Sequence, residues 1–143
     1  MQDNEVYFFT CSFKYHTLGS RFSSMVYEEL PHVAIAYFSA GADEQILYDL
    51  ASRKEGIVIV GSGNGNYSQK WLKAINELSE QGIIFVRASR VAQSIIFDDH
   101  IFDPNHYCIP ANTLTPQKAR VLLMLALSQT QDREEIKAIF KEY

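Results

Sequence analysis

The sequence is poor in the residue types that mark several classes of protein. In 143 residues it has 7 glycines, 4 prolines and 2 cysteines, which excludes collagen-like chains and disulfide-dense domains. Its longest uninterrupted apolar run, Val121–Leu127, is far too short to cross a membrane. Basic residues are also scarce, with 13 Lys and Arg against 17 Asp and Glu and a formal net charge of -4. Nucleic acids and anionic membranes attract cationic surfaces, so we expect neither as a partner.

The rest of the composition fits a single globular domain. Hydrophobic residues make up 47% of the chain, enough for a packed core at this length. Met1–Glu5 do not combine positive charge with an apolar stretch, so no secretory signal is visible. This favours a cytoplasmic location. A periplasmic location is the alternative if an upstream half that carried a signal is missing.

Strand and helix patterns alternate from residue 31 onward. Continuous apolar runs are typical of strands buried on both faces, and apolar residues at helical spacing predict amphipathic helices. The expected strands are 33–38, 56–60 and 83–86, with 94–97 and 107–109 as further short candidates, and the expected helices are 43–53, 68–82, 115–129 and 132–143. Strands separated by single helices imply right-handed crossovers and a parallel sheet. We therefore predict an α/β fold: a three-layer αβα, Rossmann- or flavodoxin-like domain with a parallel sheet of about four strands.

The first thirty residues do not share this alternation. Val6–Phe9 is aromatic and β-branched and predicts a strand, and Lys14–Ser20 is a polar stretch. Pro31 then pushes the preceding residue out of the helical region. We interpret residues 1–30 as an N-terminal arm and residues 31–143 as the α/β domain.

A glycine-rich loop follows the second strand. Gly61–Asn66 reads G-S-G-N-G-N, and its glycines allow positive φ angles and close approach of backbone. The dinucleotide fingerprint G-x-G-x-x-G is not matched, because the sixth residue is Asn66. A nucleotide site stays open as an alternative, since an arginine such as Arg87 or Arg90 after the third strand could accept a 2′-phosphate. The simpler alternatives are a tight turn without a ligand, and arginines that pair with carboxylates.

A second polar segment raises the possibility of a metal site. Asp98, Asp99, His100, Asp103, His106 and Cys108 fall within eleven positions. No H-x-x-x-H or C-x-x-C spacing is present, so a polar loop without metal is the better interpretation. Cys11 and Cys108 are expected to be unpaired thiols rather than a disulfide, because two cysteines alone do not establish one.

Four blocks of the chain, in order, resemble the C-terminal domain of bacterial L-asparaginases. They are Leu30–Tyr37, Gly56–Asn66, Val86–Val91 and Pro116–Leu123. The arm, with His16 and Thr17, resembles the connector that leads out of the N-terminal domain in that family. The resemblance implies a hydrolase that converts asparagine to aspartate and ammonia. It also implies that the threonine nucleophile lies in an N-terminal domain with no counterpart here, so the chain carries no catalytic residue and we expect it to be inactive alone.

The resemblance also implies a binding role for the glycine loop. In the family an asparagine at the end of this loop reaches the neighbouring subunit's site, and it matches Asn66. The residues that support it are Gly61, Gly63, Asn64 and Gly65. Neither a cofactor nor a metal is implied. The expected partners are a second copy in a homodimer or higher homo-oligomer, a separate asparaginase N-terminal domain, and L-asparagine once the site is complete.

One family residue has no clear match. A glutamate that binds the substrate's amino group falls on Ile101 when counted without gaps, and small gaps bring Asp99 or Asp98 there instead. The preference for asparagine or glutamine also stays open. The alternative to an enzyme part is a non-catalytic remnant, a binding or oligomerisation module of asparaginase-like fold.

Overall fold

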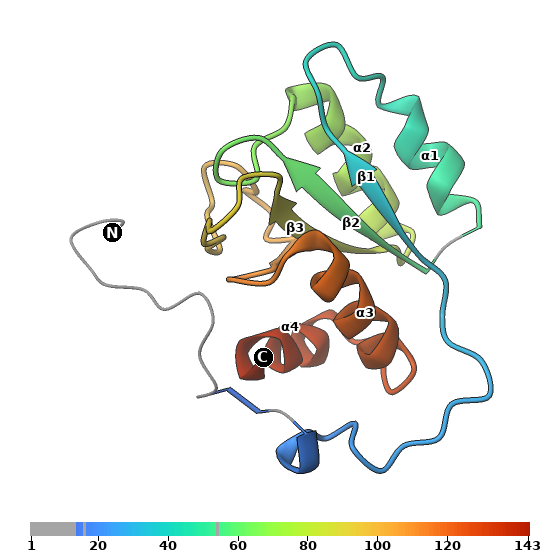
Figure 1. The fold of residues 1–143 in the computed structure, drawn as a ribbon. Helices are drawn as coiled ribbons and strands as arrows, with labels where there is room; N and C mark the ends of the chain where they lie inside the picture. Colours follow the sequence, from blue (N-terminus) through green and yellow to red (C-terminus); the bar gives the residue numbers. More distant parts are fainter. Residues whose placement is uncertain (1–13, 16, 54) are drawn as a thin grey trace.

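The computed structural model describes residues 14–15, 17–53 and 55–143 (Figure 1). The strand predicted at Val6–Phe9 and Cys11 lie outside the described residues. The elements are the 3-10 helix η1 (Thr17–Gly19), the strands β1 (Val33–Tyr37), β2 (Gly56–Gly61), β3 (Ile84–Ser89) and β4 (Cys108–Pro110), and the helices α1 (Gln45–Ala51), α2 (Gln69–Glu80), α3 (Pro116–Leu127) and α4 (Arg133–Glu142).

The strands form one parallel sheet in the order β1-β2-β3-β4. Because each crossover moves one strand further in the same direction, α1 and α2 lie on the same face of the sheet. The chain then turns back after β4, and α3 and α4 cover the opposite face (Figure 1). The predicted three-layer α/β fold with a four-stranded parallel sheet is confirmed.

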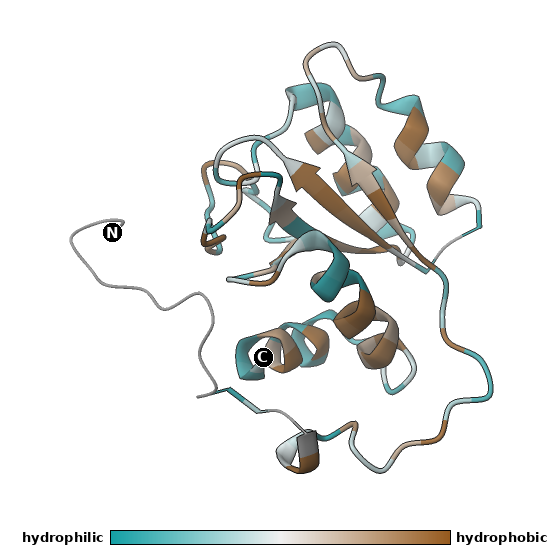
Figure 2. Cartoon of the chain, viewed as in Figure 1, coloured by the Kyte–Doolittle hydropathy of each residue, from teal (hydrophilic) through white to brown (hydrophobic). Residues whose placement is uncertain are grey.

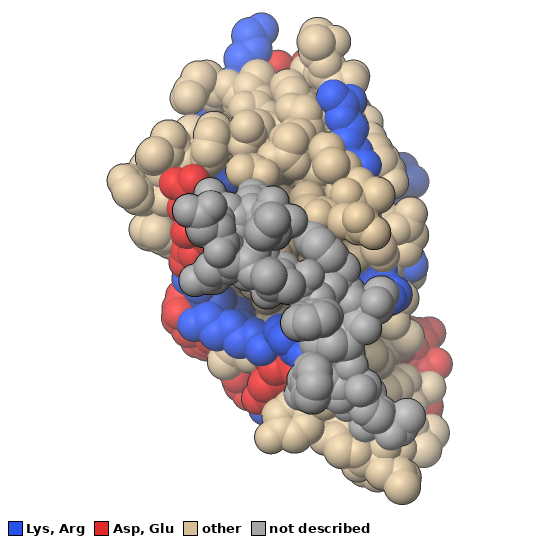
Figure 3. Space-filling model, turned by 60° about the vertical axis from the view of Figure 1, so that its left-hand side comes forward, with Lys and Arg blue, Asp and Glu red and all other residues tan. Residues whose placement is uncertain are grey.

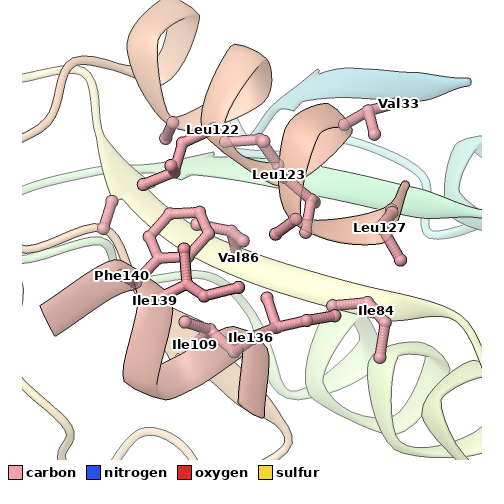
Figure 4. Packing of buried hydrophobic residues seen from close by; sticks show 14 of the residues in the cluster. Val33, Ile84, Val86, Ile109, Leu122, Leu123, Leu127, Ile136, Ile139 and Phe140 are labelled. Atoms are coloured by element: carbon pink, nitrogen blue, oxygen red, sulfur yellow. The ribbon is translucent and has the colours of Figure 1, made fainter. Parts of the chain in front are cut away.

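Alternate residues of each strand enter opposite halves of the core. Ile57, Ile59 and Phe85 pack under α1 and α2 in one cluster. Val58 and Val86 pack on the other side against α3 and α4, where Phe140 and its neighbours point toward the sheet (Figure 4). Consistent with burial on both faces, β2 is apolar along most of its length in Figure 2.

Two short regions differ from the sequence-based expectation. Residues 94–97 form no strand, because only Ile96 is paired there, in an isolated antiparallel bridge to Asn112. The other short candidate, 107–109, does form a strand, Cys108–Pro110, at the edge of the sheet, where a proline is tolerated because one side of the strand needs no partner. β3 continues past Val86 to Ser89, so a charged residue, Arg87, lies inside a buried strand.

The described part of the arm docks on the C-terminal end of α4. The Ser20 Oγ and Tyr143 Oη atoms are hydrogen-bonded at 2.6 Å, and Arg21 pairs with Glu142 at 3.2 Å. Between the arm and α3 lies an apolar groove of about 540 Å³ whose wall includes Val121. The first and last described segments therefore lie side by side although they are far apart in the sequence (Figure 1).

Two findings bear on the expected surface properties. Among the described residues, no helix is long and apolar enough to span a membrane. The face in Figure 3 carries acidic and basic side chains close together rather than a continuous basic surface.

Candidate functional site

The candidate site lies at the edge of the sheet where the parallel strands end. In open α/β sheets, the loops after the carboxyl ends of the strands build the ligand sites. Here the glycine loop follows β2 and the segment 90–107 follows β3. A cavity of about 240 Å³ at this edge is lined by residues that include Tyr37, Arg90 and Thr115.

The glycine loop is a tight turn closed by its own backbone. The amide of Asn66 donates to the Ser62 carbonyl at 2.8 Å, and Ser62 donates back at 3.0 Å. Gly61 packs directly against the return of the turn, since a Cβ atom there would lie 2.2 Å from the carbonyl carbon of Gly65. Gly63 and Gly65 have φ angles of +51° and +85°. The loop therefore needs glycine at 61 for space and at 63 and 65 for backbone conformation.

Asn66 ends this turn just before α2. Ser68 caps the helix by accepting a hydrogen bond from the Trp71 amide at 3.3 Å. The Oδ1 atom of Asn66 is buried and has no hydrogen-bond partner among the described residues. The loop thus presents an amide side chain whose hydrogen-bonding capacity is not used within the described chain.

The two arginines after the third predicted strand form no ion pair with a carboxylate among the described residues. Arg87 is only 2% exposed, and its Nη2 atom donates to the backbone carbonyl of Phe97 at 2.5 Å. Arg90 is exposed. The expected pairing with carboxylates is therefore not seen within the described part of the chain. Next along the same face of β3, Ser89 donates from its Oγ atom to the Gly63 carbonyl at 2.5 Å.

Asp98 is held by two partners in the polar segment. The Nδ1 atom of His106 lies 2.7 Å from Asp98 Oδ1, and Lys137 on α4 donates to Oδ2 at 2.5 Å. Burial alone raises the pKa of Asp98, but the hydrogen bonds and charges of Lys137 and His106 outweigh it and hold the pKa below its usual value. Each carboxylate oxygen of Asp98 therefore already has a partner within the chain.

The neighbouring residues of this segment have different surroundings. Asp99 accepts a hydrogen bond from the Ile101 amide at 2.8 Å, and the Ile101 side chain is 69% exposed. Asp103 is buried and accepts hydrogen bonds from the amides of Tyr107 and Cys108, at 3.2 and 2.7 Å. Asp103 therefore stabilises the backbone of this segment through two hydrogen bonds, whereas Asp99 lies beside exposed positions.

The described residues contain no group of His, Cys, Asp and Glu side chains arranged to hold a metal. Cys108 is a free, buried thiol. Burial and the nearby carboxylate of Asp103 raise the pKa of Cys108 to about 12, so it is protonated at neutral pH and suits neither a nucleophile nor a metal ligand.

A catalytic triad is also incomplete in the described part of the chain. The Asp98–His106 pair has the geometry that orients an imidazole, but no described hydroxyl or thiol bonds the other ring nitrogen. The described chain can therefore bind and orient a ligand with its loops, but it offers no activated nucleophile.

The parallel sheet, the helices on both faces and the glycine turn define a three-layer α/β domain with a loop-built site at the carboxyl edge. Residues 32–140 match the model of a family described as the glutaminase/asparaginase C-terminal domain. The chain belongs to this family.

Comparison with individual relatives also shows similarity to asparaginases and glutaminase-asparaginases. The chain is 34% identical to a glutaminase-asparaginase of Pseudomonas fluorescens biotype A, over 99% of this chain and 40% of the relative. It is 35% identical to a probable periplasmic L-asparaginase of Haemophilus influenzae, over 90% of this chain and 37% of the relative. A crystal structure of a probable cytoplasmic L-asparaginase from Campylobacter jejuni matches 99% of this chain and 45% of that chain, with 32% identity and a TM-score of 0.82. The chain thus spans less than half the length of these relatives.

Proposed function

We propose that the chain forms the C-terminal half of an asparagine-hydrolysing site of the L-asparaginase type and that it does not hydrolyse asparagine alone. The observation that carries the proposal is the glycine turn, which closes on itself and ends in Asn66 with its amide unused. With Oδ1 buried, the Nδ2 atom of the amide can donate a hydrogen bond to a carboxylate or carbonyl oxygen of an amino-acid substrate. The family supplies the substrate class, asparagine or glutamine.

The inactivity follows from the chemistry the described residues lack. Amide hydrolysis through a covalent step needs a nucleophile, a base and donors for the oxyanion. We expect no ammonia release above a buffer blank when the purified chain is incubated with asparagine or glutamine. Ammonia release that Asn66→Ala abolishes would contradict the proposal, provided that Gln69→Ala, a change at the exposed first residue of α2, leaves the release intact.

A mixing experiment tests the positive half of the proposal. The N-terminal half of a relative would supply the nucleophile, and this chain would supply the loop. We expect asparagine hydrolysis to appear only in the mixture and to fall with Asn66→Ala but not with Gln69→Ala, a change at the exposed first residue of α2. A mixture in which both halves are folded and bound to each other but inactive would favour the second candidate, a non-catalytic binding module. The exposed Ile101 favours that second candidate, because it offers no charge to a substrate's amino group.

We propose Asp99 as the carboxylate that faces the substrate's amino group. Asp98 is bound to His106 and Lys137, whereas one Asp99 oxygen has no hydrogen bond within the described chain. In an active mixture, Asp99→Asn should raise KM more than it lowers kcat. A larger KM effect from Asp98→Asn than from Asp99→Asn would reverse this assignment.

We infer that the chain forms a homodimer or a higher homo-oligomer. Leu18 and Val26 on the arm are each 94% exposed, and Val121 on α3 is 51% exposed beside the apolar groove. Apolar patches of this kind mark association surfaces. Sedimentation equilibrium at micromolar concentration should give at least the dimer mass, and a strictly monomeric mass would rule the inference out.

We also propose the division into an arm, residues 1–30, and a domain, residues 31–143, and a cytoplasmic location. A chain without residues 1–30 should keep the helical circular dichroism signal of the domain, and loss of that signal would contradict the division.

The location is a separate proposal, because the relatives carry both periplasmic and cytoplasmic names. Fractionation of expressing cells, with the chain in the periplasmic fraction, would contradict the location.

A further inference from the structure

Arg87 occupies an unusual place for a charged residue. It lies within β3, is 2% exposed and belongs to none of the ion pairs among the described residues. Burying an unpaired charge is costly, and an apolar side chain of similar volume would remove that cost. Stability of the core therefore does not explain an arginine at this position.

The Arg87 side chain contacts both loops of the carboxyl edge. A Cβ atom on Gly65 would lie 3.0 Å from the Arg87 Cγ atom, so the arginine stem fills the space beneath the glycine turn. At its other end, the guanidinium donates to the Phe97 carbonyl in the segment that follows β3. The same position on Gly65 would lie 3.4 Å from Ile96 Cδ1. The arginine thus links the glycine turn to the segment that follows β3.

Two unsatisfied atoms flank the Gly65 contact. The Arg87 Nε atom and the Asn66 Oδ1 atom are both buried and lack partners among the described residues. One is a donor and the other an acceptor, so a water molecule that bridges them would satisfy both. Nδ2 is not among the buried unpartnered atoms and makes no hydrogen bond within the described chain, so it is the branch of the amide that a ligand can reach.

We propose that Arg87 is the positioning residue of this site. It holds the glycine turn against the segment after β3 and fixes the Asn66 amide with its oxygen inward and its nitrogen outward. The ligand group that meets Asn66 is then a hydrogen-bond acceptor, such as a carboxylate or carbonyl oxygen. This inference rests on the proposed function for the role of Asn66, but the contacts of Arg87 stand without it.

The test compares Arg87→Met, Arg87→Lys and the matched control Arg90→Met in the full chain. Arg90 is exposed at the end of the same strand and makes no side-chain hydrogen bond among the described residues. Hydrogen exchange is measured in residues 61–66 and 94–101, where the amides of Asn66 and Ile96 are hydrogen-bonded. The NMR signals of the Asn66 side-chain amide, assigned by their loss in Asn66→Asp, report the orientation directly, and urea unfolding reports global stability.

Both Arg87 variants should lose protection by about tenfold in both segments, since methionine has no donor and lysine cannot place donors at both the Nε and the Nη2 positions. The Asn66 amide signals should move toward those of free asparagine, and the unfolding midpoint of Arg87→Met should stay equal or rise. Arg90→Met should match the wild type throughout. The proposal would be overturned if Arg87→Met lost protection throughout the chain together with a lower unfolding midpoint. It would also be overturned if protection fell in only one of the two segments or if the Asn66 amide signals did not move. Wild-type protection in Arg87→Lys would overturn it as well. None of these measurements needs a partner domain or turnover, so failure of hydrolysis in the mixing experiment is a separate result.

Discussion

The glycine loop and the segment from Val91 to Tyr107 leave neighbouring strands at one edge of the sheet, but different interactions hold them. The glycine loop is closed by backbone hydrogen bonds between Ser62 and Asn66 and by direct backbone packing at Gly61. The segment after β3 depends on side chains, chiefly those of Asp98 and Asp103. The first loop is closed chiefly by backbone contacts within its own six residues, with Arg87 and Ser89 on β3 packed against it, whereas the second is held by polar contacts that reach other elements.

This difference predicts how each loop responds to substitution. Close backbone packing leaves no room for added atoms, so changes in the glycine loop should be costly and local. The strength of a polar contact depends on its burial and charge. Substitutions in the second segment should therefore differ in how much stability they remove, and the loss should depend on pH. The following substitutions test the comparison in order of decreasing expected effect.

Gly61→Ala should be the most damaging change. The new Cβ atom would overlap the backbone at Gly65, and overpacking against rigid backbone costs about 3 kcal/mol. Urea unfolding measures the loss. Gly63→Ala is the matched control, because nothing lies within 4 Å of its Cβ position and only the positive φ is penalised, at about 1 kcal/mol. Equal losses in the two variants would mean that packing does not fix the turn.

Asp103→Ala should rank second. It leaves the amides of Tyr107 and Cys108 without acceptors beside a buried strand, and we expect a loss of about 2 kcal/mol in the free energy of unfolding. Asp99→Ala serves as the control, because Asp99 accepts a single hydrogen bond near exposed residues. If Asp99→Ala proves the more destabilising of the two, side-chain burial does not order this segment.

Asp98→Asn should cost less, about 1 kcal/mol, because the Asp98 side chain is 33% exposed and water screens its ion pairs. Its pKa in the folded chain is lowered, so its stabilisation is present above the usual value near about 3.9 and is lost as pH falls through the folded value. Unfolding curves of wild type and variant should therefore differ at pH 6, and the difference should shrink as the pH falls below the ordinary value and through the lowered pKa of Asp98. A difference of the same size at every acidic pH at which the chain is folded would show that the carboxylate charge is not the cause.

Ile101→Glu should have the smallest effect on folding, below about 0.5 kcal/mol, because the side chain is 69% exposed. Thermal unfolding checks this value. In the domain-mixing experiment the same change should lower KM for asparagine by adding a carboxylate beside the loop. An unchanged KM would place the substrate's amino group elsewhere.

The same contrast explains what could be predicted from the sequence. The sheet, its helices and the glycine turn follow from local patterns: Val and Ile runs, capping residues such as Thr115, and alternate glycines. The segment after β3 does not follow from them, because its partners are distant in the sequence. Lys137 lies 39 residues from Asp98, and no spacing rule links them. The sequence carries one signal of Arg87, a charge directly after the apolar run 83–86, and this pattern predicts the end of a strand rather than a buried link between loops.

The single tryptophan gives this molecule a built-in optical reporter. Trp71 is fully buried on the α1/α2 side of the sheet, where its indole N–H donates to the Ala42 carbonyl at 3.1 Å and its ring meets Phe38 edge-on. Its emission therefore follows the solvent exposure of that half of the core. Release of Asp98 from Lys137 should leave the emission maximum in place, whereas global unfolding should shift it to the red. Fluorescence can thus separate loop opening from loss of the fold without any added label.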